Sequence, residues 1–122
     1  MRGMLVVGHG SRSKDAMEVF AKIVEQLRSS MDMEVEGCFM EISKPFIPET
    51  VEKMYSKGIR EITVLPHFLF SGIHIKEDIP EILLSLKNSH EGLNIYMAQP
   101  IGYHEGLVEI LKERAKGELS CI

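Results

Sequence analysis

The chain has 122 residues, a length that suits one domain with an ordinary buried core and needs no disulfide or structural metal. Its net charge of -4 and the lack of a basic stripe argue against nucleic acid as a partner. We expect one domain over 1–122, in the cytoplasm and not bound to a membrane. No apolar stretch suits a signal peptide or a membrane span, and the two cysteines form no CxxC motif.

The first third of the chain predicts strand, helix and strand. A continuous apolar run over 4–7 is typical of a strand covered on both faces. Apolar residues then recur at spacings of three and four over 16–27, which predicts an amphipathic helix, and Ser13 is its expected N-cap. A strand over 33–41 follows, and its charged residues favour a place at the sheet edge.

The middle of the chain predicts a second helix and a third strand. The helix is expected to begin at Pro45 or Pro48 and to end at Gly58, since proline favours the first turn of a helix and glycine its end. The strand covers 62–65, and Pro66 ends it. We expect both elements to belong to the same domain.

The last third predicts helix, strand and helix. After a loop of about nine residues, the capping box Asp78-Ile79-Pro80-Glu81 is expected to begin the third helix. A strand over 93–97 and a helix containing Leu107 to Leu111 complete the chain. The alternation predicts an α/β fold, in which a four-stranded parallel sheet is flanked by helices.

Polar residues follow three of these strands. His9 comes after the first, Glu41 after the second, and His74 after the third, in a predicted loop. Since the carboxyl ends of parallel strands share one edge of a sheet, we expect these residues to lie around one crevice.

The two histidines indicate metal chemistry at that crevice. Gly8 and Gly10 on either side of His9 permit close approach of a ligand to the backbone, although His9 could instead bond a loop carbonyl. His74 could be an ordinary solvated loop residue. Together the two imidazoles are too few for structural zinc, but they suit an ion held briefly, such as Co²⁺, Ni²⁺ or Fe²⁺.

The other polar candidates have open roles. Glu41 could be a third metal ligand or a proton shuttle, or it could anchor its loop by accepting backbone hydrogen bonds. His67 directly follows a proline and is expected to be structural. His90 and His104 are expected at the surface.

A set of short motifs, in order and at compatible spacing, resembles the short-form sirohydrochlorin chelatases of archaea. The resemblance covers nearly the whole chain, and it is the set that is specific, since each motif alone is weak. The motifs are Val7-Gly8-His9-Gly10-Ser11-Arg12, Met40-Glu41 followed by Pro45 and Pro48, Pro66 with Phe68-Leu69, Gly72-Ile73-His74, Asp78-Ile79-Pro80 and Gln99-Pro100-Ile101-Gly102.

The resemblance implies a chelatase-like three-layer domain that inserts Co²⁺, or in methanogens Ni²⁺, into sirohydrochlorin without ATP. The product would enter cobalamin or methanogenic nickel-cofactor synthesis. No cofactor is permanently bound, because the metal is a substrate. Longer relatives carry two such domains in one chain, so a homodimer is expected.

The resemblance also implies roles for particular residues. His9 would be a metal ligand and proton acceptor, and His74 the second ligand. Lys44 would contact the substrate. The expected tetrapyrrole-contacting loop consists of Leu69, Phe70, Ser71, Gly72, Ile73 and His74.

Three alternatives stay open at this point. The enzyme could be a sirohydrochlorin ferrochelatase, or the protein could carry a metal or tetrapyrrole without catalysis. A His-Gly pair after the first strand also marks histidine phosphatases, but those enzymes need arginine before the histidine and this chain has Gly8.

Overall fold

Four parallel strands form one sheet in the order β2-β1-β3-β4. The computed structural model describes residues 1–70 and 72–122, and the side chain of each of these except His74. The parallel sheet with β2 at its edge confirms the predicted architecture. The strands are β1 (Arg2–Gly8), β2 (Glu34–Phe39), β3 (Glu61–Pro66) and β4 (Asn94–Met97).

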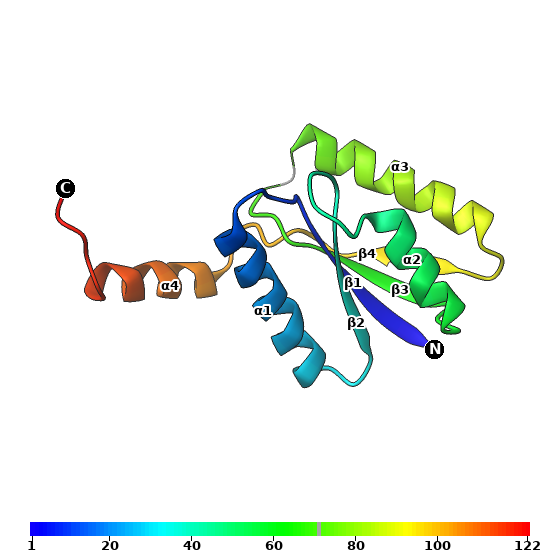
Figure 1. Ribbon diagram of the computed structural model, residues 1–122, viewed down its shortest axis with the longest axis horizontal. Helices are drawn as coiled ribbons and strands as arrows, with labels where there is room; N and C mark the ends of the chain where they lie inside the picture. Colours follow the sequence, from blue (N-terminus) through cyan, green and yellow to red (C-terminus); the bar gives the residue numbers. More distant parts are fainter. Residues whose placement is uncertain (71) are drawn as a thin grey trace.

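Helices cover the two faces of the sheet unequally (Figure 1). The first helix lies on one face, and the second and third lie on the other. No helix in the described part of the chain has the length and apolar character needed to cross a membrane. The helices are α1 (Lys14–Ser30), α2 (Ile47–Ser56), α3 (Ile73–Ser89) and α4 (Glu105–Lys116).

The apolar core has two parts, one on each face of the sheet. The larger part lies under α2 and α3, where Leu5 of β1 and Ile62 of β3 are fully buried. The smaller part lies under α1 and contains Phe20 and Val24. A Cβ on Gly37 would come within 2.9 Å of the Phe20 ring, so glycine there lets α1 pack close to β2.

The ends of α1 and α2 agree with the sequence-based expectations. The Ser13 hydroxyl accepts a hydrogen bond from the Ala16 amide at 3.3 Å, as expected of an N-cap. Helix α2 begins at Ile47 with Pro48 in its first turn. It ends just before Gly58, whose φ of 95° is a conformation that glycine adopts readily.

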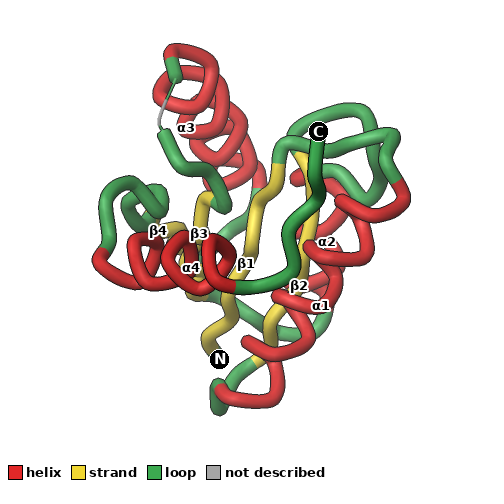
Figure 2. Tube along the Cα trace, turned by 90° about the vertical axis from the view of Figure 1, so that its left-hand side faces the viewer, coloured by secondary structure: helices red, strands yellow, loops and turns green. Residues whose placement is uncertain are grey.

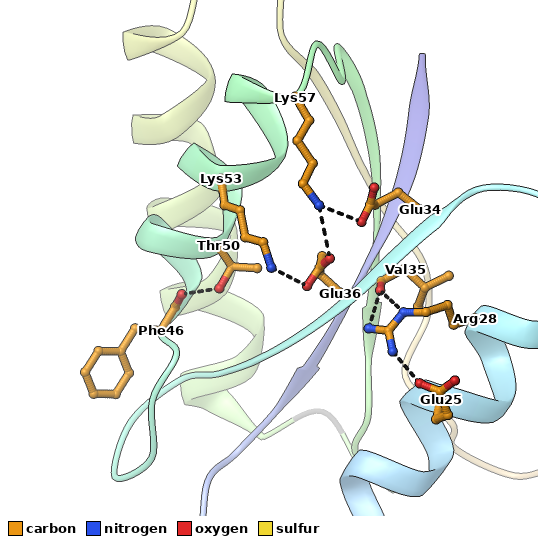
Figure 3. Close-up of polar contacts among 9 residues, drawn as sticks. All are labelled: Glu25, Arg28, Glu34, Val35, Glu36, Phe46, Thr50, Lys53 and Lys57. Carbon is orange, nitrogen blue, oxygen red and sulfur yellow. Dashed lines mark hydrogen bonds and ion pairs between the residues drawn. The ribbon is translucent and has the colours of Figure 1, made fainter.

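The charged residues of edge strand β2 are paired with the helices beside it (Figure 3). The ammonium of Lys57, the C-cap of α2, lies 3.0 Å from Glu34 and 3.9 Å from Glu36, and the hydrogen bond from Lys57 is the main reason that the pKa of Glu34 is lowered. On the other face, the Arg28 guanidinium of α1 donates to the Val35 carbonyl at 2.8 Å and 3.1 Å. These contacts join α1 and α2 to the sheet edge.

Helix α3 begins more than a turn before the position that the capping box predicts. It starts at Ile73 rather than Asp78, and Pro80 therefore lies inside it. Ile75 and Ile79, one turn apart, both pack against the larger core cluster. This burial outweighs the hydrogen bond that Pro80 cannot make, because tertiary packing of an apolar face contributes most of a helix's stability.

The prediction that His90 lies at the surface is wrong. Its ring packs edge-on against Tyr55 of α2 at 4.8 Å between centroids, and Nε2 contacts the Glu52 carboxylate. Nδ1 bonds the Leu86 carbonyl at 2.7 Å. His90 thus links the end of α3 to α2. By contrast, His104 lies at the surface as predicted, as the N-cap of α4.

Candidate active site

The loops that follow β1 and β2 are hydrogen-bonded to each other. The Met40 amide donates to the Gly8 carbonyl at 2.9 Å, and the Glu41 amide donates to the His9 carbonyl at 3.3 Å. These bonds continue the pairing of the two strands beyond their ends. They place Glu41 beside His9, as the positions after neighbouring parallel strands predict.

A serine pair holds the same two loops further along. The Ser43 hydroxyl donates to the Ser11 carbonyl at 2.7 Å and accepts from the Ser11 amide at 3.1 Å. The Ser43 amide in turn donates to the Glu41 carbonyl at 2.7 Å. Ser43 therefore anchors the loop, a role that the sequence left open for Glu41.

The glycines around His9 serve the chain's own packing. Gly10 has a φ of 105°, and a Cβ there would lie 1.9 Å from the Glu41 carbonyl oxygen. A Cβ on Gly8 would lie 2.9 Å from the Phe20 ring. Glycine is therefore needed at both positions for packing within the chain, and both glycines also line a cavity beside His9.

His9 and Glu41 form an accessible pair. His9 Nε2 lies 3.1 Å from Glu41 Oε1, and the two side chains are 56% and 63% exposed. When Nε2 carries the hydrogen and donates it to the carboxylate, Nδ1 keeps its lone pair for a metal ion or a proton. The pair thus offers one imidazole and one carboxylate, both open to a ligand.

A cavity of about 700 Å³ lies next to this pair, between the loops and α3. Its volume is within the usual range for small-molecule sites. Apolar side chains and carboxylates share its wall, which suits a largely apolar ligand and a cation together. The lining residues are His9, Met40, Glu41, Gly72, Ile75, Asp78, Glu81 and Ile82.

The sequence did not identify Asp78 and Glu81 as site residues. The capping-box pattern predicts that both lie at the start of a later helix. Because α3 begins at Ile73, they instead lie three residues apart within it, and both line the cavity. The apolar spacing through Ile75 and Ile79 was the available signal for this longer helix.

A second cavity of about 390 Å³ adjoins His9 on the side of α1. Phe20, Phe39 and His67 are among its lining residues. His67 is half-buried and packs edge-on against Phe20 at 5.7 Å between ring centroids, and burial lowers the pKa of its imidazole. His67 is therefore a neutral packing residue, in agreement with the structural role expected for it.

Two expected site residues fall partly or wholly outside what the structure describes. Ser71 is not described, and for His74 only the backbone is. That backbone lies in the first turn of α3, so the prediction that His74 lies in a loop is wrong. We expected the imidazoles of His9 and His74 to lie close together, but the His74 side chain is outside the described residues. Among the described side chains, no three of His, Cys, Asp or Glu are grouped as metal ligands.

The other expected substrate contacts lie around the same edge of the sheet. Gly72 lines the large cavity, while Leu69, Phe70 and Ile73 are exposed next to it in the chain. The most exposed is Phe70, at 80%. Lys44 is exposed on the loop after β2 and is not among the cavity's lining residues. The three apolar side chains are therefore exposed at positions that neighbour Gly72 or lie within a few residues of it in the chain.

Comparison with known proteins assigns the chain to a family. The sequence model for CbiX matches residues 3–118. This chain belongs to the CbiX family. It is 38% identical over 120 residues to the sirohydrochlorin cobaltochelatase of Sulfolobus acidocaldarius, covering 98% of this chain and 94% of that protein. The enzyme of that name from Sulfurisphaera tokodaii is 40% identical over 116 residues, covering 95% and 92%.

A solved structure extends the CbiX assignment to three dimensions. The sirohydrochlorin chelatase SirB from Bacillus subtilis subspecies spizizenii, in complex with cobalt, superposes with a TM-score of 0.88 at 31% identity. The match covers 94% of this chain but 50% of the SirB chain. The CbiX match and these likenesses confirm both the chelatase-like fold and the resemblance found in the sequence.

Proposed function

We propose that this CbiX-family protein inserts Co²⁺ into sirohydrochlorin without ATP, as a step of cobalamin synthesis. The observation that supports this most directly is the accessible His9–Glu41 pair beside the 700 Å³ cavity. The chain is also similar over nearly its whole length to two sirohydrochlorin cobaltochelatases. The metal is a substrate here, so no resident cofactor is needed.

The reaction requires a metal ligand and a proton acceptor in one place. Two pyrrole N–H protons leave the macrocycle as one dication enters. In this proposal His9 Nδ1 ligates the ion before transfer, while Glu41 accepts the two macrocycle protons one after the other and passes each to solvent. Protonated imidazole cannot bind a metal, so insertion slows in acid.

The remaining contacts that we propose involve helix α3 and the loops near the cavity. We assign His74 the second metal ligand, because its backbone lies between Gly72 and Ile75, which both line the cavity. Helix α3 has no acidic residue in its first turn, and its positive end favours carboxylate groups of a ligand. We assign further contacts with the tetrapyrrole to Lys44, to Ser71, and to the exposed residues Leu69, Phe70, Gly72 and Ile73.

Substitution of the two histidines tests the mechanism. His9→Ala and His74→Ala each remove a proposed ligand and are expected to lower the insertion rate at limiting Co²⁺ by at least about 100-fold, the usual effect of losing a catalytic group. The measurement is anaerobic absorbance spectroscopy of sirohydrochlorin.

The control is His104→Asn, which removes an imidazole outside the cavity but keeps an N-cap residue on α4. Insertion at the wild-type rate by both alanine variants would refute the mechanism.

Substitution of Lys44 tests its proposed contact with the substrate. Lys44→Ala is expected to raise the KM for sirohydrochlorin with little change in kcat, and an unchanged KM would reject its assignment.

Two alternative functions differ from this proposal, one in the metal inserted and one in the absence of turnover. Imidazole suits Ni²⁺ and Fe²⁺ as well, so a nickel or iron chelatase is the alternative enzyme. A non-catalytic carrier is the other alternative, which binds one equivalent of metal or tetrapyrrole and does not turn over.

We also propose a homodimer in the cytoplasm, where the free thiols of Cys38 and Cys121 would stay reduced.

A further inference from the structure

Three apolar residues line the large cavity from two separate elements. Met40 lies directly after β2, and Ile75 and Ile82 lie two turns apart in α3. Figure 2 shows α3 and the loops that lead into α1 and α2 on opposite sides of the carboxyl edge of the sheet. The tertiary structure thus gathers these three side chains, which we call the apolar wall, around one cavity.

Each side chain of the apolar wall is half-buried. It packs in part against the larger core cluster, and it also lines the cavity. Contact with a close-packed core holds each of the three in place. Apolar surface that is open toward a cavity is stabilised when an apolar ligand covers it. The apolar wall is therefore a preformed contact surface for the uncharged part of a ligand.

The carboxylates that share the cavity oppose an anionic group at the apolar wall. They belong to Glu41, Asp78 and Glu81, and among the described residues no lysine or arginine lines the cavity. Like charges that are brought together without a cation between them disfavour binding. Lys44 and Lys76 are exposed and are not part of the lining. The carboxylates of a ligand are therefore expected to lie away from the apolar wall.

The apolar wall is also fixed relative to the proposed metal ligand. The Met40 amide donates to the Gly8 carbonyl at 2.9 Å, and the next amide, that of Glu41, donates to the His9 carbonyl at 3.3 Å. Met40 and His9 thus belong to one hydrogen-bonded pair of loops, and both line the cavity. A ligand that packs on Met40 is held beside the His9 imidazole.

We propose that the apolar wall binds the conjugated ring of the tetrapyrrole, and that Met40 and Ile82 are substrate-binding residues that hold the ring beside His9. Sirohydrochlorin combines a flat ring with carboxylate arms along its edge. The apolar wall suits the ring, while the nearby carboxylates keep the arms away from it. The polarisable sulfur of Met40 adds a favourable contact with a conjugated ring. The inference rests on the proposed function and assigns the part of the substrate that this wall accepts.

Binding of sirohydrochlorin in the absence of metal tests the apolar wall. A titration followed by tetrapyrrole fluorescence measures the Kd without any insertion. Met40→Ala and Ile82→Ala each remove part of the wall and are expected to raise the Kd about tenfold, as the loss of an apolar contact of this size does. Met40→Leu keeps a similar apolar volume and is expected to bind like the wild type.

Leu84→Ala is the matched control. Leu84 also lies in α3 and is 58% exposed, but it does not line this cavity, so its loss should leave the Kd unchanged. Urea unfolding verifies that each variant is folded. Met40→Gln keeps the length of the side chain and makes it polar, and it replaces Met40→Ala if the alanine variant is unfolded. Folded variants of both Met40 and Ile82 that bind like the wild type would overturn the proposal.

A cation at position 40 distinguishes the ring from the arms as the bound part. In Met40→Lys the cavity lets the ammonium reach water while the stem stays on the core. At about 1 M salt, charges act over only about 3 Å, so the ammonium strengthens binding only if a carboxylate arm lies against it. We expect Met40→Lys to bind more weakly than the wild type. Tighter binding would place the arms at the apolar wall and contradict the proposal.

The outcomes separate this inference from the proposed function. Wild-type protein that binds sirohydrochlorin through the apolar wall but never inserts Co²⁺ would refute the enzyme and support the wall. Normal insertion together with an unchanged Kd in the folded Met40 and Ile82 variants would refute the wall and leave the enzyme standing. A wild-type protein that binds no sirohydrochlorin would refute both.

Discussion

The distance between the side chains of His9 and Glu41 depends on a glycine, Gly10. Gly10 brings the loop after β1 against the Glu41 carbonyl, and its φ of 105° is one that other residues adopt only with strain. The pair is also held by the backbone bond from the Glu41 amide to the His9 carbonyl. The reactive side chains are therefore placed by backbone contacts.

Gly10→Ala is expected to lower both stability and metal insertion. The added Cβ meets a backbone oxygen that cannot rotate away, so the loops must separate and His9 loses its place beside Glu41. Stability should fall by clearly more than the roughly 1 kcal/mol that follows from backbone strain alone. Urea unfolding and the insertion assay measure the two effects.

Gly92→Ala is the matched control for this prediction. Gly92 has a φ of 78°, but nothing lies within 4 Å of a Cβ placed there. It therefore reports the strain without the collision. Equal losses of stability in the two variants would show that the close approach at Gly10 has no special role.

At the scale of single elements, α3 contributes most to the shape of the site. Its early start at Ile73 brings Asp78 and Glu81 onto the cavity wall and puts His74 in a helical turn. The helix includes Pro80, whose ring nitrogen cannot donate to the Lys76 carbonyl one turn earlier. The element thus keeps an internal defect.

Pro80→Ala is expected to stabilise the protein by about 1–3 kcal/mol, since alanine restores the amide donor and has the higher helix propensity. The greater freedom of the unfolded chain offsets part of this gain. Thermal and urea unfolding measure it, with the exposed Ser85→Ala in the same helix as control. If α3 instead began at Asp78, Pro80 would lie in its first turn, and the substitution would be neutral or destabilising.

On the scale of the whole molecule, a cluster around His90 joins α2, α3 and the approach to β4. Contact with Glu52 is the main reason that the pKa of His90 is raised, and the Leu86 carbonyl adds to it. Tyr55 packs against the same ring and carries the Arg60 guanidinium on its face, 3.6 Å from the ring centroid. None of these residues lines either cavity beside His9, so we expect the cluster to affect stability rather than chemistry.

The stability contributed by His90 is expected to depend on pH. Its pKa is higher in the folded state, so the contribution is complete below the unfolded pKa of about 6.5 and is lost as the pH rises through the folded value. The stability difference between wild type and Glu52→Gln should therefore shrink as the pH rises above about 6.5. Urea unfolding at several pH values measures it. A difference that stays constant would exclude an ionic role for the pair.

Much of the site could be predicted because it depends on local pattern and strand order. His9 and Glu41 follow neighbouring parallel strands, and such positions meet at one edge whatever the details of packing. Their contact at 3.1 Å follows that expectation. The ends of α1 and α2 were predictable for a similar reason, since the Ser13 hydroxyl caps a nearby amide and Pro48 and Gly58 act through their own backbone.

Packing between distant segments decided the rest. The start of α3 depends on the burial of Ile75 and Ile79 against the core, and a capping box further along offered an equally good local start. The burial of His90 depends on Tyr55, and the need for Gly10 depends on the position of the Glu41 carbonyl.

By itself, then, the sequence determined the parallel α/β sheet, the family and the residues at the active edge, because hydrophobic periodicity and short motifs act locally. Only the tertiary structure decided which loop atoms crowd Gly10, how far α3 extends and where α4 points, because these depend on which surfaces come together. The apolar spacing of α4 is the same as that of a core helix. Such periodicity indicates that one face of the helix is buried, but it does not indicate which surface covers that face.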